Sequence, residues 1–280
     1  MPWLPIAYKE YASFDDPRNF AETELFHHRN MPESKRITLY AAPESPYPHR
    51  VRLALEEAKA TYDVIWIDLV DKPEWYAEKV NTDGGKVPYL VYGGPKLQPG
   101  DAPSGDAVGF PESLVILEFL ADIFPNAHLL PADPTLRARA RLFYSSLDAG
   151  LTKGFVGFLF MGAPLKDLLA GLDDFQARLP PTGFAVGEWS IADAAALPTL
   201  LRLQLALKDG LALCKPEDIK EAYAAVFESP KYARLRQYID DNLARPSVAR
   251  SWEPAVTKAK FEQRIKIFRA MDPTATSVPH

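Results

Sequence analysis

The chain has 280 residues, of which 47% are hydrophobic and 25% charged, with a formal net charge of −5. This composition is typical of a globular protein of one or two domains and excludes wholesale disorder. Scattered basic residues and the negative charge argue against nucleic acid as a partner. The single cysteine, Cys214, excludes an intrachain disulfide and a zinc site of several thiolates. We therefore expect a cytoplasmic protein without a bound metal, a secretory signal or a membrane span.

Residues 1–35 show no sustained period, and we interpret them as an N-terminal arm. Alternation over 37–41 predicts a strand, and apolar residues at helical spacing from Val51 predict a helix. Ser45 lies at the junction between the two. Because unpaired N–H groups at a helix start favour anions, a ligand thiolate placed beside Ser45 would be stabilised by the dipole and the hydroxyl. On this stretch alone, Ser45 could equally be a helix cap followed by Pro46.

Three further strands are predicted, at residues 62–69, 87–92 and 107–110. The first should pair in parallel with residues 37–41 through a right-handed crossover, and the other two should form a hairpin. The Gly/Pro-rich loop between them, 93–105, could gate a site or lie idle on the surface. A helix is expected to begin at Glu112 or Ser113 and to end before Pro125.

The second half of the chain has the periodicity of helices. Three prolines, Pro125, Pro131 and Pro134, lie within or beside a linker at 126–133, which separates a first domain at 36–125 from an all-helical domain at 134–280. Apolar residues from Leu136 to Phe158 predict one long amphipathic helix. The segment Ser190-Ile-Ala-Asp193 matches a capping box. Further helices are predicted at about 217–227, 230–243 and 255–270.

Several segments together resemble the cytosolic glutathione transferases. They are Ser45-Pro-Tyr-Pro-His-Arg50, Lys72-Pro-Glu-Trp75, Lys86-Val-Pro88 and Glu112-Ser113, followed by the helical second half. The resemblance covers residues 37 to about 245 and is strongest to the omega class, whose motifs include Cys-Pro-Phe/Tyr, Lys-Pro-Glu-Trp, Val-Pro and Glu-Ser. It implies an α/β, thioredoxin-like N-terminal domain followed by an all-α domain. It also implies glutathione as co-substrate, a role in detoxification, and a homodimer in which the first domain packs on the partner's helical domain.

The resemblance implies a glutathione site residue by residue. Val87 and Pro88 resemble the cis-proline turn whose backbone pairs with the cysteinyl part of glutathione. Glu112 and Ser113 resemble the pair that holds the γ-glutamyl end, and Lys72 resembles the lysine that reaches the glycyl carboxylate. Ordinary interpretations stand beside these: a trans proline at a strand start, a plain helix cap and a solvated surface lysine.

The chain departs from the omega pattern at Ser45, where the family has a cysteine. A cysteine forms a mixed disulfide with glutathione, which a serine cannot do. The serine hydroxyl can instead donate to the glutathione thiolate, as in serine-type transferases such as the tau class. A hydrogen bond to a charged group contributes roughly 1.5–3 kcal/mol and a helix end about 0.3–1 kcal/mol, so the thiol pKa should fall by about one to two units. We expect conjugation of glutathione to hydrophobic electrophiles, with peroxidase activity as a further expectation.

A pocket for the second substrate is expected between the first domain and the long helix. Tyr47, Tyr144 and Phe155 are candidate lining residues, although aromatic residues at helical spacing are more often plain core. His49 and Arg50 are expected to have structural or peripheral roles, with His49 exposed. The alternative function is a non-catalytic carrier of bulky aromatic or polyphenolic compounds. The sequence does not identify the physiological electrophile or ligand.

Overall fold

The computed structural model describes residues 35–271. Most of the predicted N-terminal arm therefore lies outside the described residues. Four strands form one sheet: β1 (Ile37–Ala41), β2 (Asp63–Trp66), β3 (Tyr89–Tyr92) and β4 (Val108–Phe110). The strand order is β2-β1-β3-β4, with β2 parallel to β1 and the pairs β1–β3 and β3–β4 antiparallel. The predicted parallel pair and the predicted hairpin are both confirmed.

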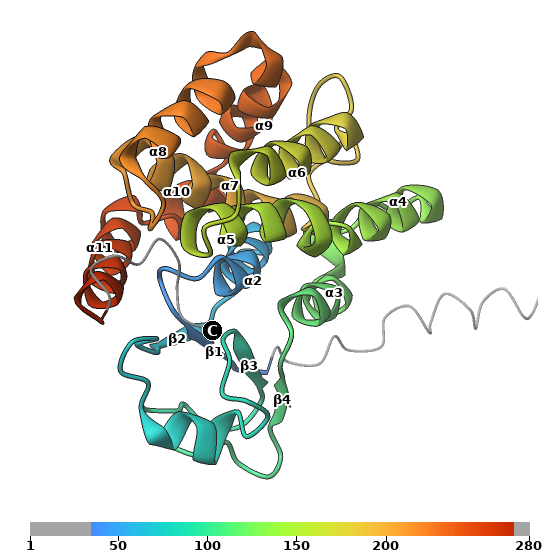
Figure 1. Ribbon diagram of the computed structural model, residues 1–280. Helices are drawn as coiled ribbons and strands as arrows, with labels where there is room; N and C mark the ends of the chain where they lie inside the picture. The colour runs from blue at the N-terminus through green and yellow to red at the C-terminus, as the bar shows by residue number, and fades with distance from the viewer. Residues whose placement is uncertain (1–34, 272–280) are drawn as a thin grey trace, which may run out of the picture. The chain divides into compact units, whose positions relative to one another are not determined.

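The central strand β1 is buried on both faces, and its successive side chains therefore belong to two separate cores. Leu39 faces the larger core, which includes buried residues of α2 (Pro46–Glu57) and α3 (Ser113–Ile123). Tyr40 faces a smaller core on the other side, where it contacts Trp75 and Tyr76. Figure 1 shows α2 and α3 on one side of the sheet and the segment after β2 on the other.

The long loop 93–105 belongs to the smaller core. Leu97, which is 5% exposed, packs in this core and anchors the loop. No residue of this loop lines either of the two cavities described below.

The second half of the described chain is helical. Its α-helices are α4 (Pro134–Ser145), α5 (Lys153–Phe160), α6 (Leu165–Arg178), α7 (Ile191–Asp209), α8 (Pro216–Tyr223), α9 (Ala233–Leu243), α10 (Pro246–Ser251) and α11 (Pro254–Met271). Shorter helical turns are η1 (Tyr76–Val80), η2 (Pro125–Ala127), η3 (Asp148–Thr152), η4 (Ala224–Glu228) and η5 (Pro230–Tyr232). The expected architecture, a thioredoxin-like domain followed by a helical domain, is confirmed (Figure 1). Helices α6 and α10 were not predicted. Across residues 35–271, no helix combines the length and apolar character of a membrane span.

Helix α7 lies at the centre of the helical domain. Every residue from Ile191 to Leu203 is buried, as expected for a helix that is apolar on all sides. The predicted capping box begins it: the Asp193 carboxylate accepts from the Ser190 N–H at 2.9 Å. The same carboxylate accepts from the Tyr238 hydroxyl at 2.9 Å, and complete burial raises its pKa to about 6. This cap therefore also ties α7 to α9.

The predicted single helix from Leu136 to Phe158 is wrong. The segment divides into α4, the π-helical turn η3 and α5, with the Thr152 N–H bonded to the Leu147 carbonyl five residues back, at 2.9 Å. Because the same face stays buried through the wide turn, apolar spacing could not reveal it. The turn places Asp148 and Thr152 at the cavities described next.

Candidate functional site

Ser45 lies directly between β1 and α2, at the position that the sequence predicted. Its backbone is extended, and Pro46 is the first helical residue. The Ser45 side chain makes no capping hydrogen bond, so it is not the simple helix cap that was the alternative interpretation. It is 8% exposed and lines a cavity of 360 Å³. The hydroxyl is therefore available to a ligand.

Prolines reduce the backbone donors at the start of α2. Pro46 and Pro48 have no N–H, so Tyr47 carries the only backbone donor between residues 46 and 48. A ligand anion at this helix end would therefore rely on the Ser45 hydroxyl more than it would at an ordinary helix end, which offers several N–H groups.

Two cavities adjoin here and share Tyr47, Lys86 and Val87. The first, the apolar cavity, has a volume of 360 Å³ and is lined by Glu44, Ser45, Pro46, Tyr47, Leu69, Lys72, Lys86, Val87, Thr152, Phe155, Val156, Phe160, Met161, Phe261 and Arg264. The second, the polar cavity, has a volume of 520 Å³ and is lined by Tyr47, Asn81, Asp83, Gly84, Lys86, Val87, Pro88, Pro111, Glu112, Ser113 and Asp148. Of the residues that the sequence predicted, only Tyr144 lines neither. Its hydroxyl donates to Glu118 at 2.6 Å.

The wall between the two cavities is a turn that buried side chains hold in place. The peptide bond between Val87 and Pro88 is cis, as the resemblance implies. The Tyr76 hydroxyl and the Asn81 amide donate to the Lys86 carbonyl at 2.7 and 2.8 Å. Both side chains are at most 2% exposed, so they fix the backbone that leads into Val87.

Glu112 and Ser113 line the polar cavity. Glu112 has φ 65° and ψ 106°, an unfavourable conformation for a side chain of its size, and strain of this kind gathers at functional sites. The buried Arg50 guanidinium donates to the Ser113 hydroxyl at 3.3 Å and lies 3.6 Å from the Asp148 carboxylate. Because the Ser113 oxygen accepts from Arg50, its own hydrogen remains available for a ligand in the cavity.

Comparisons with known proteins agree with this geometry. A family model described as glutathione S-transferase, N-terminal domain, matches residues 44–123. The structure of glutathione transferase Omega 2S from Trametes versicolor in complex with 2,4-dihydroxybenzophenone is 44% identical to this chain. It matches over 81% of this chain and 98% of its own, with a TM-score of 0.76. Glutathione transferase Omega 1C from the same organism is 40% identical over 83% of this chain and 97% of its own, with a TM-score of 0.78. The pyrimidodiazepine synthase of Drosophila melanogaster is 28% identical over 83% of this chain and 87% of its own.

The chain belongs to the glutathione transferases. Within that family it is omega-like. Its own thiol lies elsewhere: Cys214 is 7% exposed, lines neither cavity, and has its pKa raised to about 11 by burial. Within residues 35–271, no cluster of His, Cys, Asp and Glu side chains is arranged to hold a metal ion.

His49 of this transferase is buried, so the expectation that it is exposed is wrong. The residue is 3% exposed, and its ring stacks on that of Trp252 with 5.6 Å between the ring centroids. Nδ1 lies 3.1 Å from Arg202 Nη1, which can only donate, so Nδ1 accepts and the hydrogen sits on Nε2. Nε2 then donates to Ser251 at 3.1 Å. Burial, together with the Arg202 charge, lowers the pKa of His49 well below its usual range.

Arg202 fixes the loop that carries Ser45. Although it belongs to α7 of the helical domain and is 2% exposed, it donates to the carbonyls of Glu44 and Pro43, each at 2.7 Å. Burial lowers the pKa of Arg202 to about 9, so it remains protonated at neutral pH. The two residues before Ser45 are thus held by a side chain that lies more than 150 residues away in sequence.

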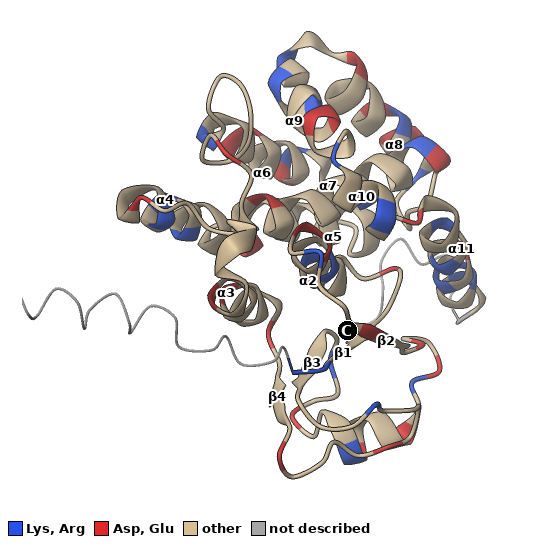
Figure 2. Ribbon diagram, turned by 180° about the vertical axis from the view of Figure 1, so that it is seen from behind, with Lys and Arg blue, Asp and Glu red and all other residues tan. Residues whose placement is uncertain are grey.

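Several cavity residues could not be predicted from local sequence. Helix α11, which is rich in Lys and Arg (Figure 2), brings Phe261 and Arg264 to the apolar cavity. Phe261 packs edge-on against Phe160 of α5 at 5.8 Å, a contact between helices about 100 residues apart. Glu44 could have been noticed from the sequence, because it directly precedes Ser45.

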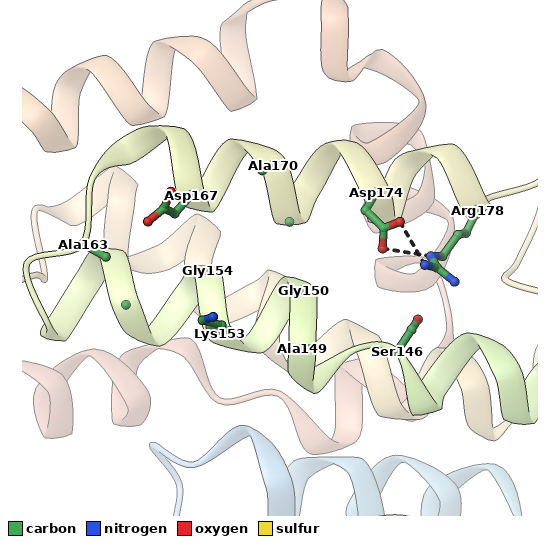
Figure 3. Close-up of a pocket in the computed structure, with 12 residues that line it drawn as sticks. Ser146, Ala149, Gly150, Lys153, Gly154, Ala163, Asp167, Ala170, Asp174 and Arg178 are labelled. Atoms are coloured by element: carbon green, nitrogen blue, oxygen red, sulfur yellow. Dashed lines mark hydrogen bonds and ion pairs between the residues drawn. The ribbon is translucent and has the colours of Figure 1, made fainter.

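A third cavity, of 570 Å³, lies between the η3–α5 segment and α6 (Figure 3). Its lining includes Gly150, Gly154 and Gly171, where the helices approach closely: a Cβ on Gly171 would lie 2.7 Å from the Gly150 carbonyl oxygen. Asp174 and Arg178 form an ion pair at its rim. It holds none of the predicted site residues, and we interpret it as a groove left by tight helix packing.

Proposed function

We propose that this protein conjugates glutathione to hydrophobic electrophiles, with the Ser45 hydroxyl donating a hydrogen bond to the glutathione thiolate. The observation that carries this proposal is the free Ser45 hydroxyl at the wall of the apolar cavity, in a chain whose single cysteine is buried elsewhere. The thiolate attacks the electrophilic carbon, the leaving group departs, and a thioether forms. A serine supports this chemistry because it need not be oxidised or form a disulfide.

The polar cavity suits the γ-glutamyl end of glutathione, and the shared wall suits its cysteinyl part. We place the ammonium beside Glu112, the α-carboxylate at the hydroxyl and N–H of Ser113, and the peptide backbone along Val87. Lys72 is exposed at the rim of the apolar cavity, where it can reach the glycyl carboxylate. The thiol then lies between Ser45 and the apolar cavity, where an electrophile can meet it.

The test compares wild type with Ser45→Ala, Ser45→Thr and Ser45→Cys in conjugation of an activated aryl chloride and in reduction of a mixed disulfide. A hydrogen bond to a charged group contributes roughly 1.5–3 kcal/mol, so Ser45→Ala should lose about 10- to 100-fold in kcat/KM. Ser45→Thr keeps a hydroxyl and should retain most of the rate. Ser45→Cys should gain disulfide reduction. Full conjugation activity in Ser45→Ala would contradict the proposal.

Peroxidase activity follows from the same thiolate. The thiolate attacks the distal oxygen of an organic hydroperoxide, which releases the alcohol and leaves the sulfenic acid of glutathione. A second glutathione then reduces this sulfenic acid, giving glutathione disulfide and water. Ser45→Ala should therefore lose conjugation and peroxidase activity in parallel, because both reactions need the same ionised sulfur.

A second candidate function is ligand carriage without turnover. It is favoured by the aromatic lining of the apolar cavity, which includes Phe155, Phe160 and Phe261, and by the relative from Trametes versicolor that was solved with a dihydroxybenzophenone. A carrier would bind aromatic compounds tightly and show negligible turnover with electrophiles and hydroperoxides, and Ser45→Ala would not change its affinity.

We further propose that the transferase acts in the cytoplasm as a homodimer. Exposed apolar residues lie on both domains: Val108 on β4 and Val115 on α3 in the first, and Leu142 on α4 in the second, at 50%, 55% and 68% exposure. A two-fold arrangement of two copies, with the first domain of one against the helical domain of the other, would bring Val108 and Val115 against the partner's α4. It would cover these two residues and Leu142. The oligomeric state measured by light scattering tests this.

A further inference from the structure

Glu44 is a buried carboxylate with one unpaired oxygen, next to the proposed thiolate site. It is 4% exposed, directly precedes Ser45 and lines the apolar cavity. Its Oε2 atom is sealed from solvent and receives no hydrogen bond. A buried charge in this condition destabilises the free protein unless a partner arrives.

The charged groups that face Glu44 do not satisfy it. Lys260 of α11 bonds to Asp68 at 2.8 Å, and the Arg264 guanidinium lies over the rings of Phe160 and Phe268 at 5.9 and 5.5 Å. Burial raises the pKa of Glu44. A hydrogen bond from its own backbone N–H and the charges of Lys260 and Arg264 oppose this rise, and Asp68 adds to it. The Glu44 carbonyl is fixed by Arg202, so the side chain starts from an immobile backbone. The carboxylate therefore stays beside the cavity as an acceptor.

The rest of the cavity limits what could pair with this carboxylate. Phe155, Phe160 and Phe261 favour an aromatic body. Lys72 and Arg264 line the same cavity and would repel a cationic ligand. An anionic ligand would be repelled by the carboxylate itself. A neutral aromatic compound with a hydroxyl donor meets both conditions.

We propose that Glu44 selects phenols as second ligands of this transferase by accepting a hydrogen bond from the phenolic hydroxyl inside the apolar cavity. This inference rests on the proposal that the apolar cavity takes the second ligand. The carboxylate can rotate about its last bond and present either oxygen to the donor. Because hydrogen bonds to buried charged groups are strong, a phenol should bind at least about tenfold more tightly than its methyl ether.

The experiment measures equilibrium binding of 4-hydroxybenzophenone, 4-methoxybenzophenone and benzophenone to wild type, Glu44→Gln and Glu44→Leu. We expect the phenol preference of about tenfold in wild type to shrink to about threefold in Glu44→Gln and to vanish in Glu44→Leu. Glu262→Gln is the matched control, because it removes an exposed carboxylate of α11 that lines neither cavity and leaves the Lys260–Asp68 ion pair intact, and it should keep the preference. Phe160→Ala should weaken the binding of all three compounds by the same factor.

Each outcome decides between the possibilities. Equal affinity for the three compounds in wild type, or a phenol preference that survives in Glu44→Leu, overturns the role of Glu44. If Phe160→Ala still weakens all three in that case, the apolar cavity stands as the ligand site. If none of the compounds binds, or Phe160→Ala has no effect, both the inference and the apolar cavity as second-ligand site are overturned. The thiolate role of Ser45 is tested separately by turnover.

Discussion

Replacement of Arg202 by methionine should loosen the loop that carries Ser45. The guanidinium donates to the Glu44, Pro43 and Pro198 carbonyls and to His49 Nδ1, at 2.7 to 3.1 Å. Methionine fills much of the same volume but donates nothing. The Glu44 carbonyl would lose this partner, whereas the Pro43 carbonyl would keep the Thr257 hydroxyl at 3.3 Å.

The size of the effect follows from these bonds. Removal of one member of a buried charged network costs about 3–5 kcal/mol, because the acceptors left behind remain buried. Ser45 follows the loosened residues directly, so we expect kcat/KM for conjugation to fall about tenfold, equivalent to about 1.4 kcal/mol of transition-state stabilisation. Arg202→Lys keeps a positive charge but can donate to only some of these acceptors. Its stability and its kcat/KM should therefore lie between those of wild type and Arg202→Met.

Urea unfolding and steady-state conjugation kinetics, both well below the thermal transition, test this prediction. A merely structural Arg202 would lower the free energy of unfolding without changing kcat/KM or the pKa in its pH profile. If Arg202→Met matched wild type in both stability and kcat/KM, Arg202 would not hold the loop that carries Ser45.

Three other predictions concern the remaining buried groups and the surface. The pKa of His49 is depressed in the folded state, so its contribution to stability is present above pH 6.5 and is lost as pH falls below that value. The free energy of unfolding should therefore fall by up to about 1.4 kcal/mol per pH unit in this range. His49→Gln should flatten this pH dependence in urea unfolding measured at pH 5 to 7. Leu142→Glu should convert the proposed dimer to a monomer in light scattering, while a dimer of unchanged affinity would contradict the interface. Iodoacetamide should leave conjugation intact, because Cys214 is buried and has a pKa of about 11; rapid inactivation that Cys214→Ala prevents would show the thiol to be accessible.

The parts that the sequence predicted well depend on local patterns. Strand alternation around Leu39, the position of Ser45 before Pro46, and the capping box at Ser190 each arise from residues a few positions apart. Such patterns record backbone geometry directly, so they survive without knowledge of the tertiary fold.

The parts that were missed depend on contacts between distant segments. The burial of His49 needs α7 and α10, which contact it from more than 150 residues away. Phe261 reaches the apolar cavity only because α11 packs against α5. Periodicity identifies an apolar face but does not say which face of the fold will cover it.

We propose that the Ser45 hydroxyl holds the glutathione thiol as a thiolate. The direct measurement is a titration of bound glutathione by thiolate ultraviolet absorbance, in wild type, Ser45→Thr and Ser45→Ala. We expect a bound thiol pKa about one to two units below 8.5 in wild type and Ser45→Thr, and a value back near 8.5 in Ser45→Ala. An equally low pKa in Ser45→Ala would rule out this role of Ser45, because the anion would then be stabilised by another group.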